Sequence, residues 1–167
     1  MAYLLHPPML DENGLAGALR WYIQGATERS GVAMTLDIAS NFGRLPREIE
    51  LIVFRTVQEC LTNIHRHSES KTAFIRVERN ADKVSVEVRD EGRGIAADRL
   101  AEIQKAQSSG VGINGMRERV LQQSGSMTIQ SNGRGTRVFI DLPLVSPPTY
   151  GSESTVSADV AHSMASN

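Results

Sequence analysis

The sequence has 167 residues, of which 40% are hydrophobic and 22% charged, and its formal net charge is -1 at pH 7. This length and composition predict one globular domain with a sizeable core and some uncovered chain, and they leave no room for a second full domain. Lysine and arginine are scattered and no apolar run approaches roughly 18 residues, which argues against nucleic acid as a partner and against membrane contact.

The first element predicted along the chain is a helix over residues 14–30, preceded by a linker over residues 1–12. The linker contains two consecutive prolines, which end any helix that arrives from upstream. The helix has apolar residues at helical spacing, Asn13 as its N-cap and a glycine after its last residue. Residues 32–38 then alternate between apolar and polar, as a half-buried strand does.

A second helix is predicted over residues 46–67, where apolar residues recur every third and fourth position and form one broad face. Cys60 lies on that face and is the only cysteine, which excludes an internal disulfide and fits a reducing cytoplasm. At about 100° per residue, Glu59 and Asn63 lie at the margin of the face, and His67 falls two turns beyond Glu59. Polar groups at such a margin need polar partners, a cation or a ligand. The three side chains are candidates for a polar ridge facing a cleft, with a solvated helix edge as the alternative.

Residues 71–78 and 83–90 both alternate and are joined by a polar loop, which predicts a hairpin whose second strand ends at Asp90. Gly92 and Gly94 follow closely, so a rigid strand delivers a carboxylate into a turn that a ligand can approach. This arrangement is a fixed place for a hydrogen-bond acceptor. The alternative is a simple turn, in which aspartate and glycine are ordinary residues.

A second glycine cluster, Gly110, Gly112 and Gly115, follows a short helical pattern over residues 97–106 and a polar spacer. The cluster opens another predicted helix, and glycines at a helix N-terminus expose backbone N–H groups that hold phosphate. Its spacing also matches the glycine fingerprint of dinucleotide-binding folds. That fingerprint needs a strand directly before the first glycine and an acidic residue about twenty positions on, and both are missing here. A nicotinamide cofactor is therefore disfavoured.

The predicted folded part closes with a hairpin of strands over residues 126–131 and 136–142, with Asn132 and Gly133 as the turn signal. Residues 146–167 shift to serine, threonine, proline and glycine, which predicts a disordered tail. The sequence thus assigns residues 13–145 to one folded domain.

Four motifs stand in order along the chain: ECLTNIHRH, DEGRG, GVGINGM and GTRVFIDLP. Together they resemble the catalytic, ATP-binding domain of sensor histidine kinases, in the GHKL (Bergerat) superfamily. They are most similar to the nitrate-sensor and desaturase-regulator type of two-component kinase. The resemblance covers about residues 10–144 and implies ATP and Mg²⁺ as cofactors. It also implies a two-layer α/β sandwich, with a mixed, mostly antiparallel sheet covered by helices on one face.

The resemblance assigns a role to each residue that the sequence singles out. On the helix, Asn63 would be the Mg²⁺ ligand, with Glu59 as its polar companion and His67 approaching the phosphates. At the strand end, Asp90 would accept a hydrogen bond from the adenine amino group, and Thr136 would support that carboxylate directly or through water. The other nucleotide-binding positions are Gly92, Gly94 and Ile95 near the base, and Gly110, Val111 and Gly112 near the phosphates.

The implied activity is donation of the ATP γ-phosphoryl group to a histidine on the dimerisation domain of the same kinase, for relay to an aspartate on a response regulator. Residues 97–109 would form a lid over the nucleotide. The phospho-accepting histidine is expected upstream of Met1, because His6 does not match its motif.

Two other functions fit parts of the same pattern. An anti-sigma-factor serine kinase shares this fold and is naturally short, but the LLHPPML segment and the HRH ending of the helix motif disfavour it. A non-catalytic ATP-sensing or interaction module would bind nucleotide or a partner protein and transfer no phosphoryl group. Titration with Mg-ATP and the identity of the phosphorylated partner distinguish these alternatives.

Overall fold

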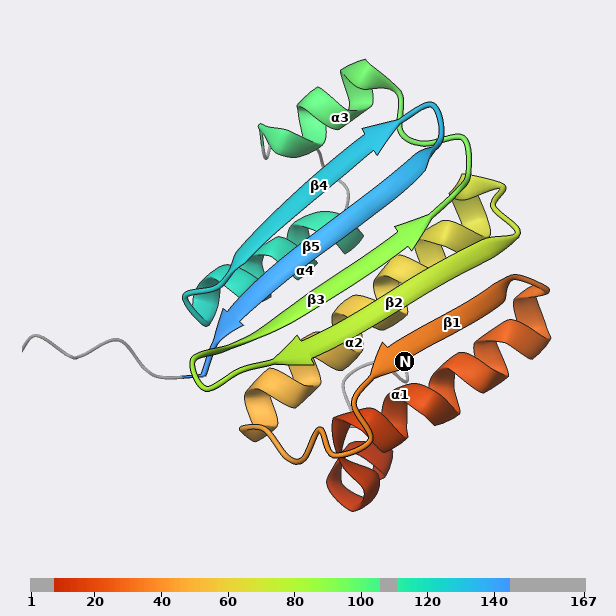
Figure 1. Cartoon of the computed structure of the whole chain (residues 1–167). Coiled ribbons are helices and arrows are strands. Elements are labelled where there is room, and N and C mark those ends of the chain that lie inside the picture. Colours follow the sequence, from red (N-terminus) through yellow and green to blue (C-terminus); the bar gives the residue numbers. More distant parts are fainter. Residues whose placement is uncertain (1–7, 106–110, 145–167) are drawn as a thin grey trace, which may run out of the picture.

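The computed structural model describes residues 8–105 and 111–144. A five-stranded sheet in the order β1-β2-β3-β5-β4 forms its centre (Figure 1). The strands are β1 (Ala33–Ile38), β2 (Thr72–Arg79), β3 (Lys83–Asp90), β4 (Ser126–Asn132) and β5 (Gly135–Pro143). β1 pairs in parallel with β2, and the other neighbouring strands are antiparallel. The mixed, mostly antiparallel sheet expected from the sequence is confirmed, and so are both hairpins.

Helices cover one face of this sheet and flank its β4 edge (Figure 1). They are α1 (Pro8–Ser30), α2 (Arg47–Asn63), α3 (Ala97–Gln104) and α4 (Val111–Gln122), with a π-helical turn, η1 (Ile64–Ser68), continuing α2. In Figure 1, α1, α2 and α4 lie against the sheet, and α3 lies beside the edge strand β4. The result is a two-layer sandwich with its core between the layers. Within the described ranges, no helix is both long and apolar enough to cross a membrane.

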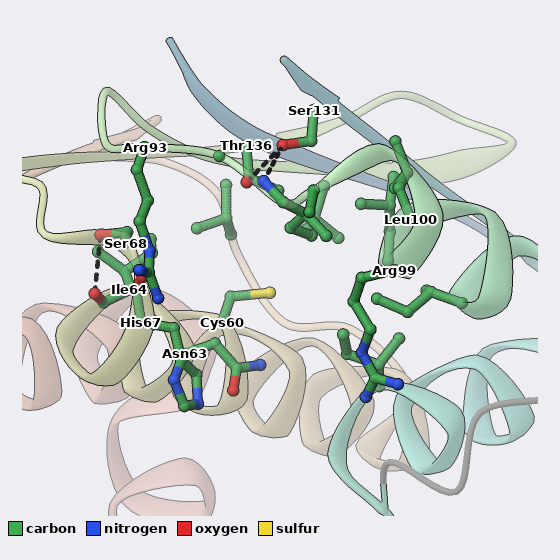
Figure 2. A pocket seen from close by; sticks show the side chains of 18 of the residues that line it. Cys60, Asn63, Ile64, His67, Ser68, Arg93, Arg99, Leu100, Ser131 and Thr136 are labelled. Atoms are coloured by element: carbon green, nitrogen blue, oxygen red, sulfur yellow. Dashed lines mark hydrogen bonds between the residues drawn. The ribbon is translucent and has the colours of Figure 1, made fainter. Parts of the chain in front are cut away.

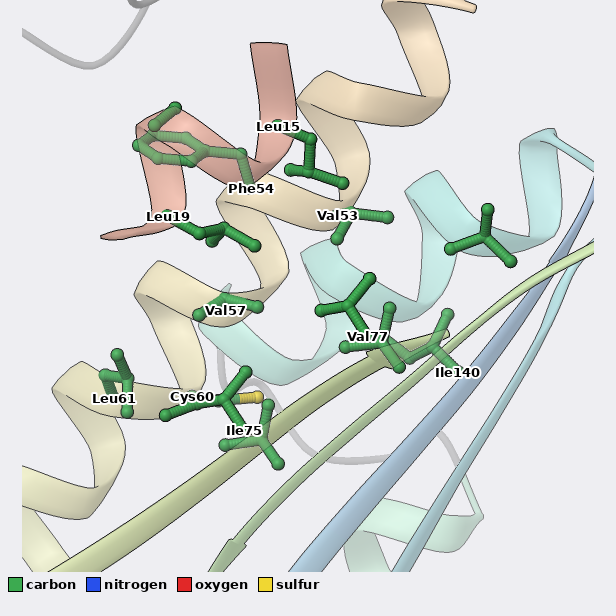
Figure 3. Packing of buried hydrophobic residues seen from close by; sticks show 14 of the residues in the cluster. Leu15, Leu19, Val53, Phe54, Val57, Cys60, Leu61, Ile75, Val77 and Ile140 are labelled. Atoms are coloured by element: carbon green, nitrogen blue, oxygen red, sulfur yellow. The ribbon is translucent and has the colours of Figure 1, made fainter. Parts of the chain in front are cut away.

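The core forms where alternate strand residues meet the apolar faces of α1 and α2, because successive side chains on a strand point to opposite faces. The sheet contributes Ile75, Val77, Val84, Val86, Val88, Ile140 and Leu142, all at most 2% exposed. Figure 3 shows Cys60 of α2 facing Ile75, and Phe54 of α2 close to Leu15 and Leu19 of α1. The broad apolar face predicted for residues 46–67 is therefore the side of α2 that packs on the sheet.

The opposite face of the sheet is mainly polar, and its two phenylalanine rings, Phe74 and Phe139, lie under arginine side chains. Arg76 Nε of β2 lies 2.9 Å from Asp37 Oδ2 of β1, and Arg137 Nε of β5 lies 3.1 Å from Glu87 Oε1 of β3. These ion pairs run between neighbouring strands, where oppositely charged side chains on one face stabilise the pairing. The sheet thus has one apolar face toward the helices and one charged face away from them.

The N-terminal helix starts earlier than the sequence predicts. α1 begins at Pro8, inside the residues 1–12 that the sequence assigns to a linker, and Leu10 is fully buried in the core. Proline in the first turn of a helix costs no hydrogen bond, because the first N–H groups have no partner within the helix. The helix is interrupted at Gly14, whose φ of 65° and ψ of -176° are not helical. Pro8 therefore permits a short helical segment that the break at Gly14 separates from the main helix.

Candidate active site

A cavity of about 1000 Å³ lies between α2, η1, α3, α4 and the ends of strands β3, β4 and β5. Its size is at the upper end of the range for small-molecule sites, roughly 300–1,000 Å³. Apolar side chains from both layers line it, among them Val88, Ile129, Val138, Ile64, Ile95, Leu100, Ile103, Ile113 and Met116. The polar lining comprises Glu59, Asn63, His67, Ser68, Arg93, Arg99, Ser131, Asn132 and Thr136. Figure 2 shows this cavity from close by.

Glu59, Asn63 and His67 all line the cavity; Glu59 and Asn63 are partly buried, whereas His67 is exposed. Asn63 is the last residue of α2, and His67 lies in η1, where the helix widens to the π form. Figure 2 shows Asn63 and His67 next to one another on consecutive turns. Among the described residues, the Asn63 side chain makes no hydrogen bond, which leaves its amide available to a ligand.

Gly112, in the first turn of α4, lies against the Glu59 carboxylate. A Cβ at position 112 would displace Glu59 Oε1, so the glycine lets α4 and α2 approach closely at the cavity. The first turn of a helix carries unpaired N–H groups and a partial positive charge, which favour a carboxylate or another anion there. The cavity therefore has a polar end where α2 meets α4.

Asp90 ends β3 and is 8% exposed. Its Oδ1 accepts a 2.8 Å hydrogen bond from the Gly92 N–H, and the backbone N–H of Thr136 on β5 also donates to the carboxylate. Burial raises the pKa of the Asp90 carboxyl, and the two N–H donors oppose that rise. Residues two apart share a face of a strand, so Asp90 lies on the same face as the cavity residue Val88. Among the described residues, Asp90 and Gly92 stand beside the cavity wall without being part of its lining.

Ser131 and Thr136 connect the closing hairpin to the loop that follows β3. Their hydroxyl oxygens are 3.0 Å apart, and Ser131 Oγ accepts a 2.7 Å hydrogen bond from the Ile95 N–H. The sequence predicts that Thr136 supports Asp90, and this role stays a prediction. In the structure, the backbone N–H of Thr136 points to the Asp90 carboxylate, and its hydroxyl faces Ser131. The sequence does not point to Ser131, because a serine near a hairpin turn carries no signal of its own.

Gly92 and Gly94 are explained by contacts within the chain. A Cβ at Gly92 would overlap the carbonyl oxygen of Ser68 in η1, and a Cβ at Gly94 would overlap the carbonyl oxygen of Asn132 at the end of β4. Gly94 also has a φ of 74°, a left-handed conformation that disfavours any residue with a Cβ. The two glycines therefore let the loop after Asp90 pack against its neighbours, in addition to any access that they give to a ligand.

Replacing Gly94 by alanine is expected to lower the free energy of unfolding by about 2 kcal/mol or more, because left-handed strain adds to a backbone overlap. Urea denaturation of the two proteins measures this difference. Gly133→Ala is the matched control, since a Cβ there has nothing within 4 Å. Equal destabilisation by the two substitutions would contradict the contact assigned to Gly94.

Some predicted positions lie at or beyond the limits of the described residues. Gly110 lies outside them, as do residues 106–109 of the predicted lid, and Val111 is the first residue of α4. The start of the lid forms α3, and Arg99 reaches from it into the space beside the other helices (Figure 2). Arg99 and Arg93 are cavity residues that sequence reasoning missed. Arg93 belongs to the DEGRG motif, but the site residues predicted from that motif are Asp90, Gly92 and Gly94.

An α/β sandwich with a cavity between its helices and the ends of its strands is the architecture that the sequence resemblance implies. The sequence profile of the family described as histidine kinase-, DNA gyrase B-, and HSP90-like ATPase matches residues 48–146. The chain belongs to this family, and family membership implies ATP as its ligand.

Curated relatives place the resemblance among sensor histidine kinases. The chain is 32% identical over 140 residues to the sensor histidine kinase NarS of Mycobacterium tuberculosis, an alignment that covers 84% of this chain and 32% of NarS. It is 34% identical over 142 residues to the signal transduction histidine-protein kinase/phosphatase DegS of Bacillus subtilis, covering 83% of this chain and 36% of DegS. The chain thus spans about a third of the length of these relatives.

Solved structures support the fold. The histidine kinase domain of the blue-light activated histidine kinase EL346 from Erythrobacter litoralis superposes with a TM-score of 0.64 at 24% identity, covering 78% of this chain and 60% of that one. The Acinetobacter baumannii histidine kinase AdeS superposes with a TM-score of 0.61 at 15% identity, covering 80% of this chain and 64% of that one. The fold of the chain is therefore that of histidine kinase ATPase domains.

Proposed function

We propose that the chain binds Mg-ATP in the cavity and donates the γ-phosphoryl group to a histidine on the dimerisation domain of the same kinase, for relay to an aspartate on a response regulator. Family membership supports ATP as the ligand, and the two curated relatives support a histidine kinase. The observation that carries the proposal is one continuous cavity, which reaches from beside the Asp90 turn to the Asn63 margin of α2.

The sheet end of the cavity fits an adenine base. Val88, Ile129 and Val138 offer apolar side chains on which a flat ring can lie. Asp90 stands beside them as a buried acceptor, and the hydrogen bonds it already makes come from backbone N–H donors. A carboxylate has about four acceptor positions and two are used, so acceptor capacity remains for the amino group of adenine. Asp90 is therefore the residue proposed to select the base.

The helix end of the cavity fits the phosphates. Glu59 touches the first turn of α4 at Gly112, so α2 and α4 meet where N–H groups and the positive end of a helix dipole favour anions. His67 and Arg99 bring groups that can carry positive charge to the same cavity. Phosphoryl transfer depends mainly on positioning and on neutralising charge, and these residues supply both.

Asn63 is the proposed protein ligand of Mg²⁺. A hard cation prefers oxygen donors, and the amide oxygen of Asn63 and the carboxylate of Glu59 lie one helical turn apart at the cavity. No group of three or more His, Cys, Asp or Glu that could hold a metal occurs in the described part of the chain. Most ligands of the ion would therefore be phosphate and water oxygens, as is usual for Mg²⁺, and the bound ion would neutralise charge on the transferring group.

Phosphorylation of a separately supplied acceptor tests this function. The chain is incubated with Mg²⁺ and γ-labelled ATP, and is offered either the dimerisation domain of its kinase or an anti-anti-sigma protein. We expect acid-labile label on a histidine of the dimerisation domain, and none on a variant of that domain with the histidine replaced.

Two outcomes would contradict the proposed function. Label on a serine of the anti-anti-sigma protein would assign the chain to the serine kinases. A calorimetric titration without heat of Mg-ATP binding would leave an interaction module as the better interpretation.

A further inference from the structure

The carbonyl groups at the end of η1 are hydrogen-bonded by Arg93, from the loop that follows β3. Arg93 Nε donates to the His67 carbonyl oxygen at 2.9 Å, and the Arg93 backbone N–H donates to the Ser68 carbonyl oxygen at 2.9 Å. The last carbonyls of a helix have no partner within it, so an outside donor stabilises them, and the helix dipole favours a cation there. Figure 2 shows Arg93 reaching from the loop to the turn that carries His67.

The loop that contains Arg93 starts with the Asp90 turn. The Gly92 N–H donates to Asp90 Oδ1. Gly92 also packs so closely against the Ser68 carbonyl oxygen that a side chain at position 92 would overlap it. The turn beside the sheet end of the cavity and the turn at its helix end are therefore in direct contact. A change in how Arg93 binds η1 would alter the position of His67 relative to Asp90.

Only one contact of Arg93 depends strongly on its side chain. The backbone bond to Ser68 persists when the side chain is changed, whereas the Nε bond to His67 does not. Arg93 Nη1 also lies 3.4 Å from Glu69 Oε1, but these side chains are 62% and 76% exposed, and such pairs contribute little. The Nε–H···O=C bond to His67 is also exposed, but at 2.9 Å it is the only hydrogen bond of the Arg93 side chain to another described residue's backbone, so it is the contact that the arginine side chain supplies.

We propose that Arg93 is a positioning residue, whose Nε–H bond to the His67 carbonyl sets the phosphate side of the cavity relative to the adenine side. The inference rests on the proposed function, since it takes the base to lie near Asp90 and the phosphates near His67. Loss of the bond then weakens recognition of the phosphates, while the base keeps its contacts. Arg93 acts through His67 and needs no contact with the nucleotide.

Two substitutions separate this bond from the charge of Arg93. Glutamine has an amide nitrogen at the same number of bonds from Cα as arginine Nε, so Arg93→Gln keeps a neutral donor for the His67 carbonyl. Arg93→Met has a similar shape without a donor. Arg29→Met, at the end of α1 away from the cavity, controls for removal of one surface charge.

Calorimetric affinities for adenosine and for Mg-ATP are measured for each protein. For Arg93→Met we expect Mg-ATP affinity to fall by roughly threefold to tenfold, the range of one hydrogen bond, while adenosine affinity changes by less than about twofold. Arg93→Gln is expected to recover most of the Mg-ATP affinity. In the protein without nucleotide, the carbonyl ¹³C shift of His67 should move in the methionine variant and return in the glutamine variant.

Several results would overturn the inference. Equal loss of Mg-ATP affinity in the methionine and glutamine variants would mean that the charge of Arg93 acts on the phosphates directly. An equal loss of affinity for adenosine and for Mg-ATP would mean that Arg93 supports only the Asp90 turn. Unchanged affinities in both variants would mean that Arg93 has no positioning role. Failure of the unsubstituted chain to bind Mg-ATP would instead refute the proposed function, independently of the His67 carbonyl shift.

Discussion

Asp90→Asn is expected to weaken the binding of adenosine and of Mg-ATP to the same extent, by roughly 100-fold or about 3 kcal/mol. The carboxylate of Asp90 receives N–H groups from Gly92 and Thr136, and it is proposed to receive the amino group of adenine as a third donor. An asparagine amide has only one oxygen and adds two N–H donors. At least one N–H of the new amide would face another N–H donor at a nearly buried position, and such an unsatisfied pair raises the free energy of the complex.

Calorimetry with adenosine and Mg-ATP measures this effect, with Asp82→Asn in the exposed β2–β3 turn as the control. Acid should have a related effect on the unsubstituted protein. Burial raises the pKa of Asp90, so the carboxylate becomes protonated, and loses acceptor positions, at a higher pH than an ordinary aspartate. Adenosine affinity should therefore fall as the pH is lowered through that raised value, and the asparagine variant should lack the step. A pH profile shared by both proteins would contradict the role of Asp90.

Asn63→Asp should affect the other end of the cavity. Phosphoryl transfer is expected to fall on the order of 100-fold, as it does when one positioned polar group is lost from an active site. The substitution removes the amide and places a second negative charge one helical turn from Glu59, near the phosphates. Adenosine carries no phosphate, so its affinity should change by less than about twofold.

Initial rates of phosphoryl transfer to the dimerisation domain, together with adenosine titrations, show whether Asn63 affects the phosphate end of the cavity and not the adenine end. Gln58→Glu is the matched control, because it adds the same charge to α2, at a position that is not among the described residues lining the cavity. Equal losses of adenosine and Mg-ATP binding in the Asn63 variant would show that Asn63 serves the whole nucleotide rather than the phosphate end.

The sequence predicts most of the fold because its periodicities are local. The alternation of residues 83–90 and the apolar stripe of residues 46–67 each follow from one element's burial pattern, and both elements are found in the structure. The start of α1 is different. Leu10 is fully buried in a core whose other members are mostly distant in sequence, so its packing favours helix at Pro8, where local rules predict only a linker.

In the candidate site, too, local features can be predicted from the sequence and contacts between distant segments cannot. The margin formed by Glu59, Asn63 and His67 is visible in the sequence because one helix carries all three. Contacts between distant segments are not visible there: Arg93 binds a carbonyl 26 residues away, and Ser131 binds an N–H 36 residues away. Sequence motifs identify the residues that a ligand requires, whereas these links depend on how loops pack once the sheet has formed.

The most direct test of the account is a crystal structure of the chain with Mg²⁺ and a non-hydrolysable ATP analogue. We expect the adenine amino group within hydrogen-bond distance of the Asp90 carboxylate, and the metal ion on the amide oxygen of Asn63 and on phosphate oxygens. A nucleotide bound outside the cavity, or one with its base at Asn63 and its phosphates at Asp90, would contradict the account.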